Sequence, residues 1–529
     1  MRDGVRLATD VYLPPNPGAL PAVLVRLPYD KNGWFGFWSL AASFFNARGY
    51  AVVIQDTRGK NRSEGHPLAF HHEASDGFDT LEWIERQPWS NRIVGMFGES
   101  YVGFTQWAAK GSGHPALRAI VPRLTTTEVA RDWMYHQGVF CLETMAEWAS
   151  QAWLDSSLYE GELDWTTRPL ADIVPAIAGG TRSESFDRWI RELPDAAYWR
   201  QAAVFPTPLS GRSLPALHWG GWWDIFRKGQ IRDYQSAASH SDAQYLIMSS
   251  LDHMGNTLAP DDAPQDAYAM TAEGIERALP GLLEPIAEFF DRHLRDRHVA
   301  VPRIRWHLAN DEWRTADEWP PPGSRELRLF LTDLARAAHG PGGGALALKP
   351  DSARGSASWV HDPGNLVPSV VDAWSPLLWL PDEREVELRD DVLTFTSDVF
   401  DPLDLAGPVM AHLEVAGTDA PAHLVAKLVD VFPTGRARRI TEGAIRLPAS
   451  SEELRGDIDL GHVGYRVRAG HALRLEVSAS SFPRYLPASG SDADPWWATA
   501  APVSARRLES GGEGASYVSL RVVGNRSRG

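Results

Sequence analysis

A serine between glycines carries the clearest chemical signal in the chain. Residues 98–103 read Gly-Glu-Ser-Tyr-Val-Gly, and they follow the apolar run 93–97 and precede a helical stretch. Small residues at such a junction permit the sharp strand-to-helix turn that raises a serine hydroxyl above a sheet. The motif departs from G-x-S-x-G, because Val102 occupies the last glycine position and Gly103 follows it. Ser100 is therefore a candidate nucleophile, with a helix N-cap serine as the alternative interpretation.

A nucleophilic serine needs a base that accepts its proton and an acid that orients the base. In folds that present a serine in this way, the acid follows a late strand and the histidine follows the last strand. Asp224 follows the segment 215–223, and His253 follows the segment 244–250. We predict Ser100 as nucleophile, His253 as base and Asp224 as orienting acid, a set that would transfer an acyl group in two steps.

Asp252 competes with Asp224 for the role of the acid. It immediately precedes His253, and neighbouring side chains point in different directions, so Asp252 is poorly placed to hold the imidazole ring. Residues 71–73, His-His-Glu, are interpreted as a solvated loop, and no spacing of histidines and acids indicates a metal site. The predicted chemistry needs neither a metal nor an organic cofactor. Three further histidines are interpreted as ordinary polar groups of the core or surface: His136, His218 and His240.

The first half of the chain contains short apolar runs that end in turn-forming or polar residues. Runs of this length are typical of buried strands in a mainly parallel sheet. Helical stretches such as 76–86 and 102–110 alternate with them, which predicts an α/β domain with helices on both faces of the sheet. The predicted strands are residues 22–27, 51–54, 93–97, 119–121, 216–219 and 245–248.

Two other regions have different patterns. Between residues 128 and 205 the strand pattern stops and aromatic residues recur at loose helical spacings, which predicts an inserted helical cap. From about residue 321 apolar and polar residues alternate, as at 327–331 and 473–477, which predicts antiparallel strands with one face in water. We predict an α/β-hydrolase core over residues 1–127 and 206–320, a helical cap over 128–205 and a C-terminal jelly-roll β-sandwich over 321–529.

The overall composition limits the class of protein. With 529 residues, 43% of them hydrophobic and 23% charged, the chain is long enough for two or three globular units. The formal net charge of -16 disfavours binding to nucleic acid. The single cysteine, Cys141, excludes an internal disulfide and fits a reducing cytosol, and no segment approaches about 18 uninterrupted apolar residues. We expect a soluble cytoplasmic protein without a membrane partner. The sequence does not determine the oligomeric state, and it is compatible with a homo-oligomer.

The sequence resembles the cocaine esterase and X-Pro dipeptidyl-peptidase branch of the α/β-hydrolases over nearly its whole length. Several separate motifs support this resemblance, which makes it more specific than one pentapeptide. They are Met-Arg-Asp-Gly-Val-Arg-Leu-Ala at residues 1–8, Pro-Tyr-Asp-Lys at 28–31, Val-Ile-Gln-Asp-Thr-Arg-Gly at 53–59, the motif at 98–103, Gly-Trp-Trp-Asp at 221–224 and Ala-Lys-Leu-Val-Asp-Val-Phe-Pro at 426–433.

The resemblance implies the same three catalytic residues, Ser100, Asp224 and His253, and it adds an oxyanion hole. The tyrosine of the family's Pro-Tyr-Asp-Lys motif maps to Tyr29. Its hydroxyl would bind the oxyanion together with the backbone N–H of Tyr101. Without the resemblance, Tyr29 would be interpreted as a core tyrosine.

The resemblance also implies a substrate pocket, and it includes one motif that we interpret as structural. Trp133, Trp148 and Phe226 would line the acyl pocket, and residues 374–389 would bring the sandwich to it. Arg58, in the Asp-Thr-Arg-Gly motif, is interpreted as a structural arginine held by backbone carbonyls.

These observations together predict a serine hydrolase that cleaves carboxylic esters, or activated amides, of a small molecule. The alternatives within the class are an X-Pro dipeptidyl-peptidase and an α-amino acid ester hydrolase or acylase. Either of these binds a free ammonium group, which calls for converging carboxylates, and Asp132, Glu143 and Glu147 are candidates. The alternative of another class is a non-catalytic protein that binds a ligand through the sandwich, and it leaves the serine, aspartate and histidine unexplained.

Overall fold

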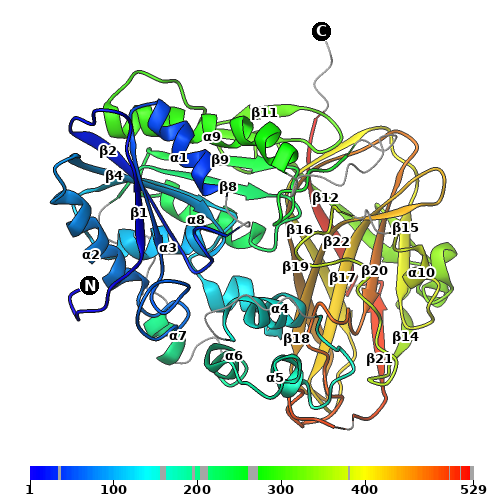
Figure 1. The fold of residues 1–529 in the computed structure, drawn as a ribbon. Helices are drawn as coiled ribbons and strands as arrows, with labels where there is room; N and C mark the ends of the chain where they lie inside the picture. The colour runs from blue at the N-terminus through cyan, green and yellow to red at the C-terminus, as the bar shows by residue number, and fades with distance from the viewer. Residues whose placement is uncertain are drawn as a thin grey trace.

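Two sheets lie side by side in the computed structural model, with a group of helices from residues 142–202 beside both of them (Figure 1). The first sheet comes from the amino-terminal part of the chain and the second from the carboxy-terminal part. The structure describes residues 1–33, 37–154, 162–192, 197–202, 213–259, 272–378, 382–499, 501–512 and 514–524.

The first sheet is parallel except at its two edges. In sheet order its strands are β1 (Thr9–Tyr12), β3 (Ala51–Asp56), β2 (Leu20–Leu27), β4 (Ser90–Glu99), β5 (Leu117–Arg123), β8 (Ala216–Gly221), β9 (Gln244–Ser249), β10 (Ile304–His307) and β11 (Trp313–Ala316). Only the edge strands β1 and β11 pair antiparallel with their neighbours among the described strands. The six strands predicted from apolar runs all lie in this sheet, so their prediction is confirmed.

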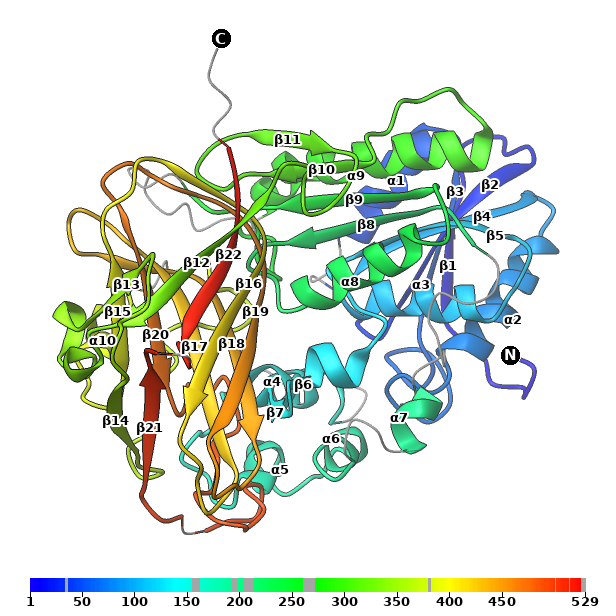
Figure 2. The same ribbon diagram turned by 180° about the vertical axis from the view of Figure 1, so that it is seen from behind.

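Helices cover both faces of this sheet, as predicted. Alternate side chains of a strand point to opposite faces, so Val23 and Leu24 belong to different apolar layers. The layer with Val23 holds α1 (Trp38–Ala47) and α9 (Ala272–Arg295). The opposite face carries α2 (Glu73–Glu85), α3 (Tyr101–Gly111) and α8 (Arg227–Ala238), and Figure 2 shows α8 beside β8 and β9.

The chain between β5 and β8 leaves the sheet and forms short helices around an aromatic cluster. A short hairpin with two residues in each strand interrupts these helices, and the sequence analysis did not predict it. In chain order the described elements are a π-helix (Val129–Met134), β6 (Tyr135–His136), β7 (Val139–Phe140), α4 (Leu142–Ala152), a 3-10 turn (Leu170–Asp172), α5 (Ile173–Ile177), α6 (Glu184–Trp189) and α7 (Ala197–Ala202).

The second sheet curves into a β-sandwich, in agreement with the predicted fold (Figure 2). Its strands follow the path β14 (Gly355–His361), β21 (Ser504–Ser510), β16 (Leu403–Val415), β22 (Tyr517–Val523), β12 (Arg325–Thr332), β13 (Gly344–Ala347), β15 (Leu393–Ser397), β20 (Ala472–Ser478), β17 (Ala422–Val431) and β18 (Ala437–Leu447). β19 (Leu454–Val467) pairs with β16, and the short helical elements are Leu334–Arg336, Gly340–Gly342 and α10 (Arg384–Glu387).

The expectation that each sandwich strand has one face in water is wrong for β20. Arg474 and Glu476, the polar residues between its apolar ones, are both buried. Arg474 donates to Glu387 at 2.6 Å, and Lys427 of the neighbouring strand β17 lies 3.6 Å from Glu476. Burying a charge is tolerated where an opposite charge accompanies it, and these ion pairs supply that condition.

The first sheet and the sandwich share a continuous apolar cluster. Trp222, at the end of β8, packs with Trp306 and Trp319, and this group continues into the core of the sandwich. Arg227 of α8 donates to Thr441 of β18 at 2.7 Å, which ties the two parts together. The boundary that the sequence predicts, between residues 320 and 321, falls between β11 and β12, and we propose it as the division between two parts that share this core. None of the described helices combines the length and apolarity that a membrane crossing requires.

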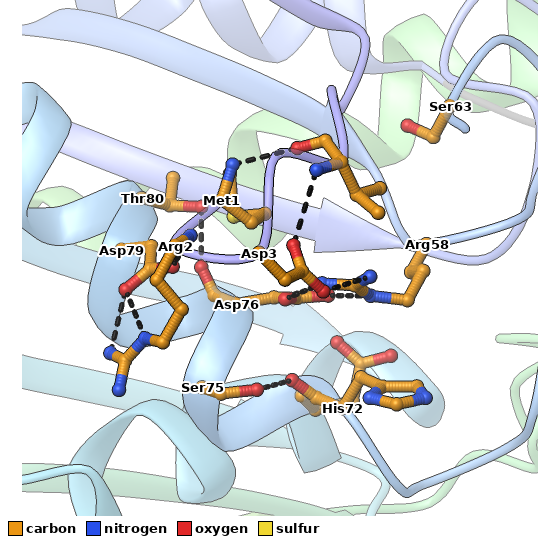
Figure 3. Close-up of polar contacts among 12 residues, drawn as sticks. Met1, Arg2, Asp3, Arg58, Ser63, His72, Ser75, Asp76, Asp79 and Thr80 are labelled. Carbon is orange, nitrogen blue, oxygen red and sulfur yellow. Dashed lines mark hydrogen bonds and ion pairs between the residues drawn. The ribbon is translucent and has the colours of Figure 1, made fainter. Parts of the chain in front are cut away.

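Arg58 of the Asp-Thr-Arg-Gly motif lies between two carboxylates at the amino-terminal segment (Figure 3). Its guanidinium donates to Asp76 of α2 at 2.9 and 2.6 Å and to Asp3 at 2.7 Å. Arg2 forms a second ion pair nearby, with Asp79 at 2.6 Å. The interpretation of Arg58 as an arginine held by backbone carbonyls is therefore wrong, since charged acceptors bind a guanidinium more strongly than neutral carbonyls.

Candidate active site

Ser100 occupies the turn between β4 and α3. Its backbone has φ 59° and ψ −128°, a conformation that residues other than glycine rarely adopt. The backbone N–H of Ser100 donates to the carbonyls of Arg123 and Leu124, at 3.0 and 3.1 Å, which holds the turn against the end of β5. Such strain persists only where surrounding contacts over-determine it, and it concentrates at functional sites.

Two glycines explain how the motif around Ser100 tolerates valine at the last position. A Cβ atom on Gly98 would lie 2.3 Å from the Val102 side chain, and one on Gly103 would lie 2.5 Å from Thr125. The missing Cβ of Gly98 therefore leaves room for Val102, and that of Gly103 lets α3 pack closely on Thr125. The glycine that allows this close packing of the helix is therefore Gly103, one residue later than the last glycine of the G-x-S-x-G pattern.

The structure brings Ser100, His253 and Asp224 together from the segments that follow β4, β9 and β8. His253 follows β9, and its Nε2 atom lies 3.1 Å from the Ser100 hydroxyl. Its Nδ1 atom lies 2.7 Å from Oδ1 of Asp224, which follows β8. All three side chains are buried. A carboxylate beside Nδ1 requires the proton on that nitrogen, so Nε2 is left as the acceptor that faces the serine.

Asp252 lies beside His253 in sequence but directs its carboxylate away from the imidazole. Its oxygens accept from the backbone and side chain of Asn256 at 2.9 to 3.2 Å. They also accept from the backbone N–H of Leu377 at 3.1 Å. Burial raises the pKa of Asp252 to about 7. The carboxylate that contacts the ring is thus that of Asp224.

Tyr29 follows β2, on the same edge of the sheet as Ser100. Its hydroxyl accepts a hydrogen bond from the indole of Trp148 at 3.1 Å. Burial raises the pKa of the Tyr29 phenol, and hydrogen bonds to Trp148 and to the Ser100 side chain oppose that rise. The phenol is therefore protonated near neutral pH and can donate toward the serine. The other implied donor, the backbone N–H of Tyr101, is the first of helix α3, a position without an intrahelical acceptor.

The side chain of Tyr101 points away from this edge and stabilises the scaffold. Its hydroxyl donates to Glu73 at 3.0 Å, and Glu73 forms an ion pair with the buried Arg26 at 2.9 Å. Glu73 is 4% exposed. The interpretation of residues 71–73 as a solvated loop is therefore wrong for Glu73, because α2 begins there and Arg26 needs a counterion.

A group of aromatic side chains lies beside the His253 ring. Trp133 contacts both Trp148 and Phe226, with ring centroids 4.4 and 4.8 Å apart, and Phe226 lies 5.4 Å from the His253 ring. The predicted pocket residues thus form one connected group next to the imidazole. The sandwich adds Trp374, whose ring centroid lies 5.0 Å from that of His253. The sequence analysis expects the stretch 374–389 at the pocket but does not single out Trp374, and residues 379–381 lie outside the described part.

Among the acids considered for an ammonium group, Asp132 is engaged elsewhere. It forms an ion pair with Arg232 and accepts from Thr126 at 3.1 Å. Glu143 and Glu147, one turn apart on α4, instead meet Asp372 of the sandwich, and one oxygen of each lies within 4.8 Å of the others. These carboxylates could hold a metal ion or another cation.

The carboxylates of Glu143, Glu147 and Asp372 repel one another, and Arg484 offsets this repulsion only in part at Glu143. Within the described part of the chain, no lysine or arginine forms an ion pair with any of the three, and Oε2 of the buried Glu143 has no hydrogen-bond partner. Burial raises the pKa of Glu143 to about 7 and that of Glu147 to about 8, and the neighbouring carboxylates add to both rises. A cation would relieve this repulsion.

The remaining candidate histidines lie apart from Ser100. His218 is buried in β8 and pairs with Gln244 at 3.1 Å, and His136 lies 3.3 Å from the Tyr485 hydroxyl. His240 is exposed and contacts the Ser236 carbonyl at 2.9 Å. Each is a polar group with a local partner, in line with its interpretation from the sequence.

Comparison with known proteins identifies relatives that cover most of the chain. Residues 3–255 match the family model described as X-Pro dipeptidyl-peptidase (S15 family), and residues 298–518 match that of the X-Pro dipeptidyl-peptidase C-terminal non-catalytic domain. Cocaine esterase from Rhodococcus sp. is 32% identical over 92% of this chain and 90% of its own length. A putative serine esterase from Mycobacterium bovis is 25% identical over 84% of this chain and 79% of its own.

The fold is also similar to solved structures. An α-amino acid ester hydrolase superposes with a TM-score of 0.82 at 25% sequence identity, covering 99% of this chain and 95% of that one. The similarity therefore extends over the α/β core, the inserted helices and the sandwich together.

Proposed function

Since this chain belongs to the family of cocaine esterase and X-Pro dipeptidyl-peptidase, and is a hydrolase, we propose that it cleaves carboxylic esters of small molecules through an acyl-enzyme on Ser100. The Ser100 hydroxyl attacks the ester carbonyl while His253 accepts its proton at Nε2. His253 then gives that proton to the departing alcohol, and the C–O bond to the alcohol breaks. Water repeats the sequence on the acyl-enzyme and releases the acid.

The observation that carries the proposal is the hydrogen-bonded series from Asp224 through His253 to Ser100. The distances of 2.7 and 3.1 Å lie within the range in which a base can accept the serine proton. Asp224 keeps the proton on Nδ1 and stabilises the imidazolium that forms during attack. The strained turn at Ser100 supports the same assignment.

An oxyanion hole completes the proposal. Negative charge develops on the carbonyl oxygen in the tetrahedral intermediate, and donors aimed at it in advance lower the barrier. Tyr29 supplies a phenolic O–H, and Tyr101 supplies a backbone N–H at the start of α3. The bond from Trp148 occupies a lone pair of the Tyr29 oxygen, which leaves the phenolic proton available to the substrate.

A second candidate is an ester or peptide hydrolase whose substrate carries a free ammonium group. The cluster of Glu143, Glu147 and Asp372 favours it, because an ammonium group has N–H donors for converging carboxylate oxygens. Asp372 accepts the backbone N–H of Trp374, whose ring lies 5.0 Å from that of His253, so the cluster lies near the proposed base. X-Pro dipeptides and α-amino acid esters are the two substrate types of this kind that relatives suggest.

A panel of chromogenic substrates tests the two candidates against each other. It comprises p-nitrophenyl esters of neutral acids, p-nitrophenyl esters of amino acids and an X-Pro p-nitroanilide. The main proposal expects turnover of the neutral esters that is lost in Ser100→Ala. A much higher kcat/KM for amino acid esters than for neutral esters of equal size would favour the second candidate. Absence of turnover for every member of the panel would contradict both.

A further inference from the structure

We propose that Asp252 is a positioning residue that holds His253 against Trp374 of the sandwich. The proposal rests on the proposed function, because it assigns Asp252 a role that acts through the histidine base. Asp252 is completely buried, and it has no ion-pair partner among the described residues. A buried carboxylate without a cation is costly to retain, so its hydrogen bonds indicate what it does.

One set of these hydrogen bonds closes the loop that carries His253. The backbone and side chain of Asn256 donate to Asp252, and the backbone N–H of Asp252 donates back to the Asn256 carbonyl at 3.0 Å. The N–H of Leu258 donates to the Ser250 carbonyl at 2.9 Å, which joins the two ends of the loop. His253 therefore sits on a turn whose conformation Asp252 fixes from inside.

The other hydrogen bond crosses to the sandwich. Oδ2 of Asp252 accepts the backbone N–H of Leu377 at 3.1 Å. Upstream, Oδ1 of Asp372 accepts the N–H groups of Trp374 and Ser375 at 2.9 and 2.6 Å. The segment that supplies Trp374 is therefore fixed at one end by Asp372 and at the other end by Asp252.

The consequence is a histidine ring enclosed by two parts of the protein. Phe226 from the α/β core and Trp374 from the sandwich lie 5.4 and 5.0 Å from the His253 ring. Asp252 bonds to both the loop and the Trp374 segment, so it sets the distance between them. Without it we expect the ring and Trp374 to shift relative to each other, which would misplace Nε2 with respect to Ser100.

A double-mutant cycle with Asp252→Ala and Trp374→Ala tests the proposal on a p-nitrophenyl ester. Displacing a reacting group by about 1 Å costs on the order of 100-fold, so we expect Asp252→Ala to lower kcat/KM by about 10- to 100-fold. In the Trp374→Ala background the same substitution should cost much less. Equal factors in both backgrounds would overturn the coupling to Trp374.

Two further variants separate positioning from loss of stability. Asn256→Ala removes only the two side-chain bonds inside the loop, so it should lower the melting temperature but reduce kcat/KM less than Asp252→Ala does. Asp252→Asn keeps one oxygen acceptor and should restore most of the activity, with a remaining loss in kcat/KM of less than about 10-fold. If Asp252→Ala does not fold, Asp252→Asn replaces it in the cycle, and its smaller factor should likewise disappear in the Trp374→Ala background. Parental kcat/KM in a folded Asp252→Ala, with Ser100→Ala inactive, would overturn this proposal while leaving the proposed function intact.

Discussion

The indole N–H of Trp148 donates a hydrogen bond to the phenolic oxygen of Tyr29 at 3.1 Å. This contact joins helix α4 to the edge of the sheet at which Ser100 emerges, and it orients a hydroxyl that an isolated core tyrosine would leave free to rotate. The inserted helices therefore help to build the proposed oxyanion hole as well as the pocket wall.

We predict that Tyr29→Phe lowers turnover while leaving stability nearly unchanged. Phenylalanine keeps the ring and its packing but removes the donor, and loss of one oxyanion donor typically costs roughly 100- to 1000-fold in kcat. The measurement is ester turnover together with the melting temperature. A stable variant within a few-fold of parental turnover would remove Tyr29 from the site. Trp148→Phe serves as a comparison, because it removes the bond that orients the phenol but keeps the phenolic donor, so it should cost less turnover, although the smaller ring also loses packing against Trp133.

Asp224→Asn and Asp252→Asn should differ widely in their effects. An amide at position 224 favours the wrong tautomer of His253, and the analogous change in a serine protease costs about 10,000-fold in kcat. Asp252 acts only through position and retains an acceptor as asparagine, so we expect its loss to stay within about 10-fold. The measurement is the turnover of one ester by both variants. A larger loss in Asp252→Asn than in Asp224→Asn would show that the acid is wrongly assigned.

Removal of residues 321–529 should give insoluble or inactive protein. Trp222, Trp306 and Trp319 bury their rings in a cluster that continues into the sandwich, so truncation would expose a large apolar surface. Solubility and ester turnover of the fragment 1–320 provide the measurement. A soluble fragment with full activity would show that the sandwich is an accessory module and that Trp374 is dispensable.

If the carboxylate cluster binds an ammonium group, binding should weaken as the pH falls. The pKa values of Glu143 and Glu147, about 7 and about 8, are raised, so both groups are charged above these values and lose charge as the pH falls through them. n-Butylamine stays protonated throughout this range, as a lysine side chain does. Its inhibition of ester turnover should therefore become weaker as the pH is lowered from about 9 to about 6.

The matched variant for this prediction is Glu143→Gln. It removes one charge of the cluster without changing its size, so inhibition by n-butylamine should become weaker at high pH, and the pH dependence that remains should come from Glu147. Inhibition that is equally strong in the parent and in Glu143→Gln would show that the amine binds elsewhere.

Local patterns were sufficient to predict the elements around Ser100. The apolar run before it, the glycines beside it and the helix after it are all encoded within about a dozen neighbouring residues, and the chain order of acid and histidine followed from the same fold. The departure at Val102 could be noticed but not explained, because its cause is the contact between Gly103 and Thr125.

Contacts between distant segments could not be predicted in the same way. Asp372 and Trp374 reach the site from the sandwich, more than a hundred residues beyond His253, and no local period marks them. The buried charges of β20 also follow the alternating pattern of an exposed strand, because alternation shows which residues share a face but not what covers that face. The burial of Glu73 on α2 has the same kind of cause, since its partner Arg26 lies on strand β2, nearly fifty residues earlier in the chain.

The most direct test of the account is covalent labelling of the nucleophile. An organophosphonate should react with the protein in a one-to-one ratio, abolish ester turnover and leave its adduct on Ser100, as peptide mass spectrometry would show. Ser100→Ala should neither react nor turn over the ester. An adduct on another residue, or full esterase activity in Ser100→Ala, would contradict the assignment of Ser100 as the residue that carries the acyl group.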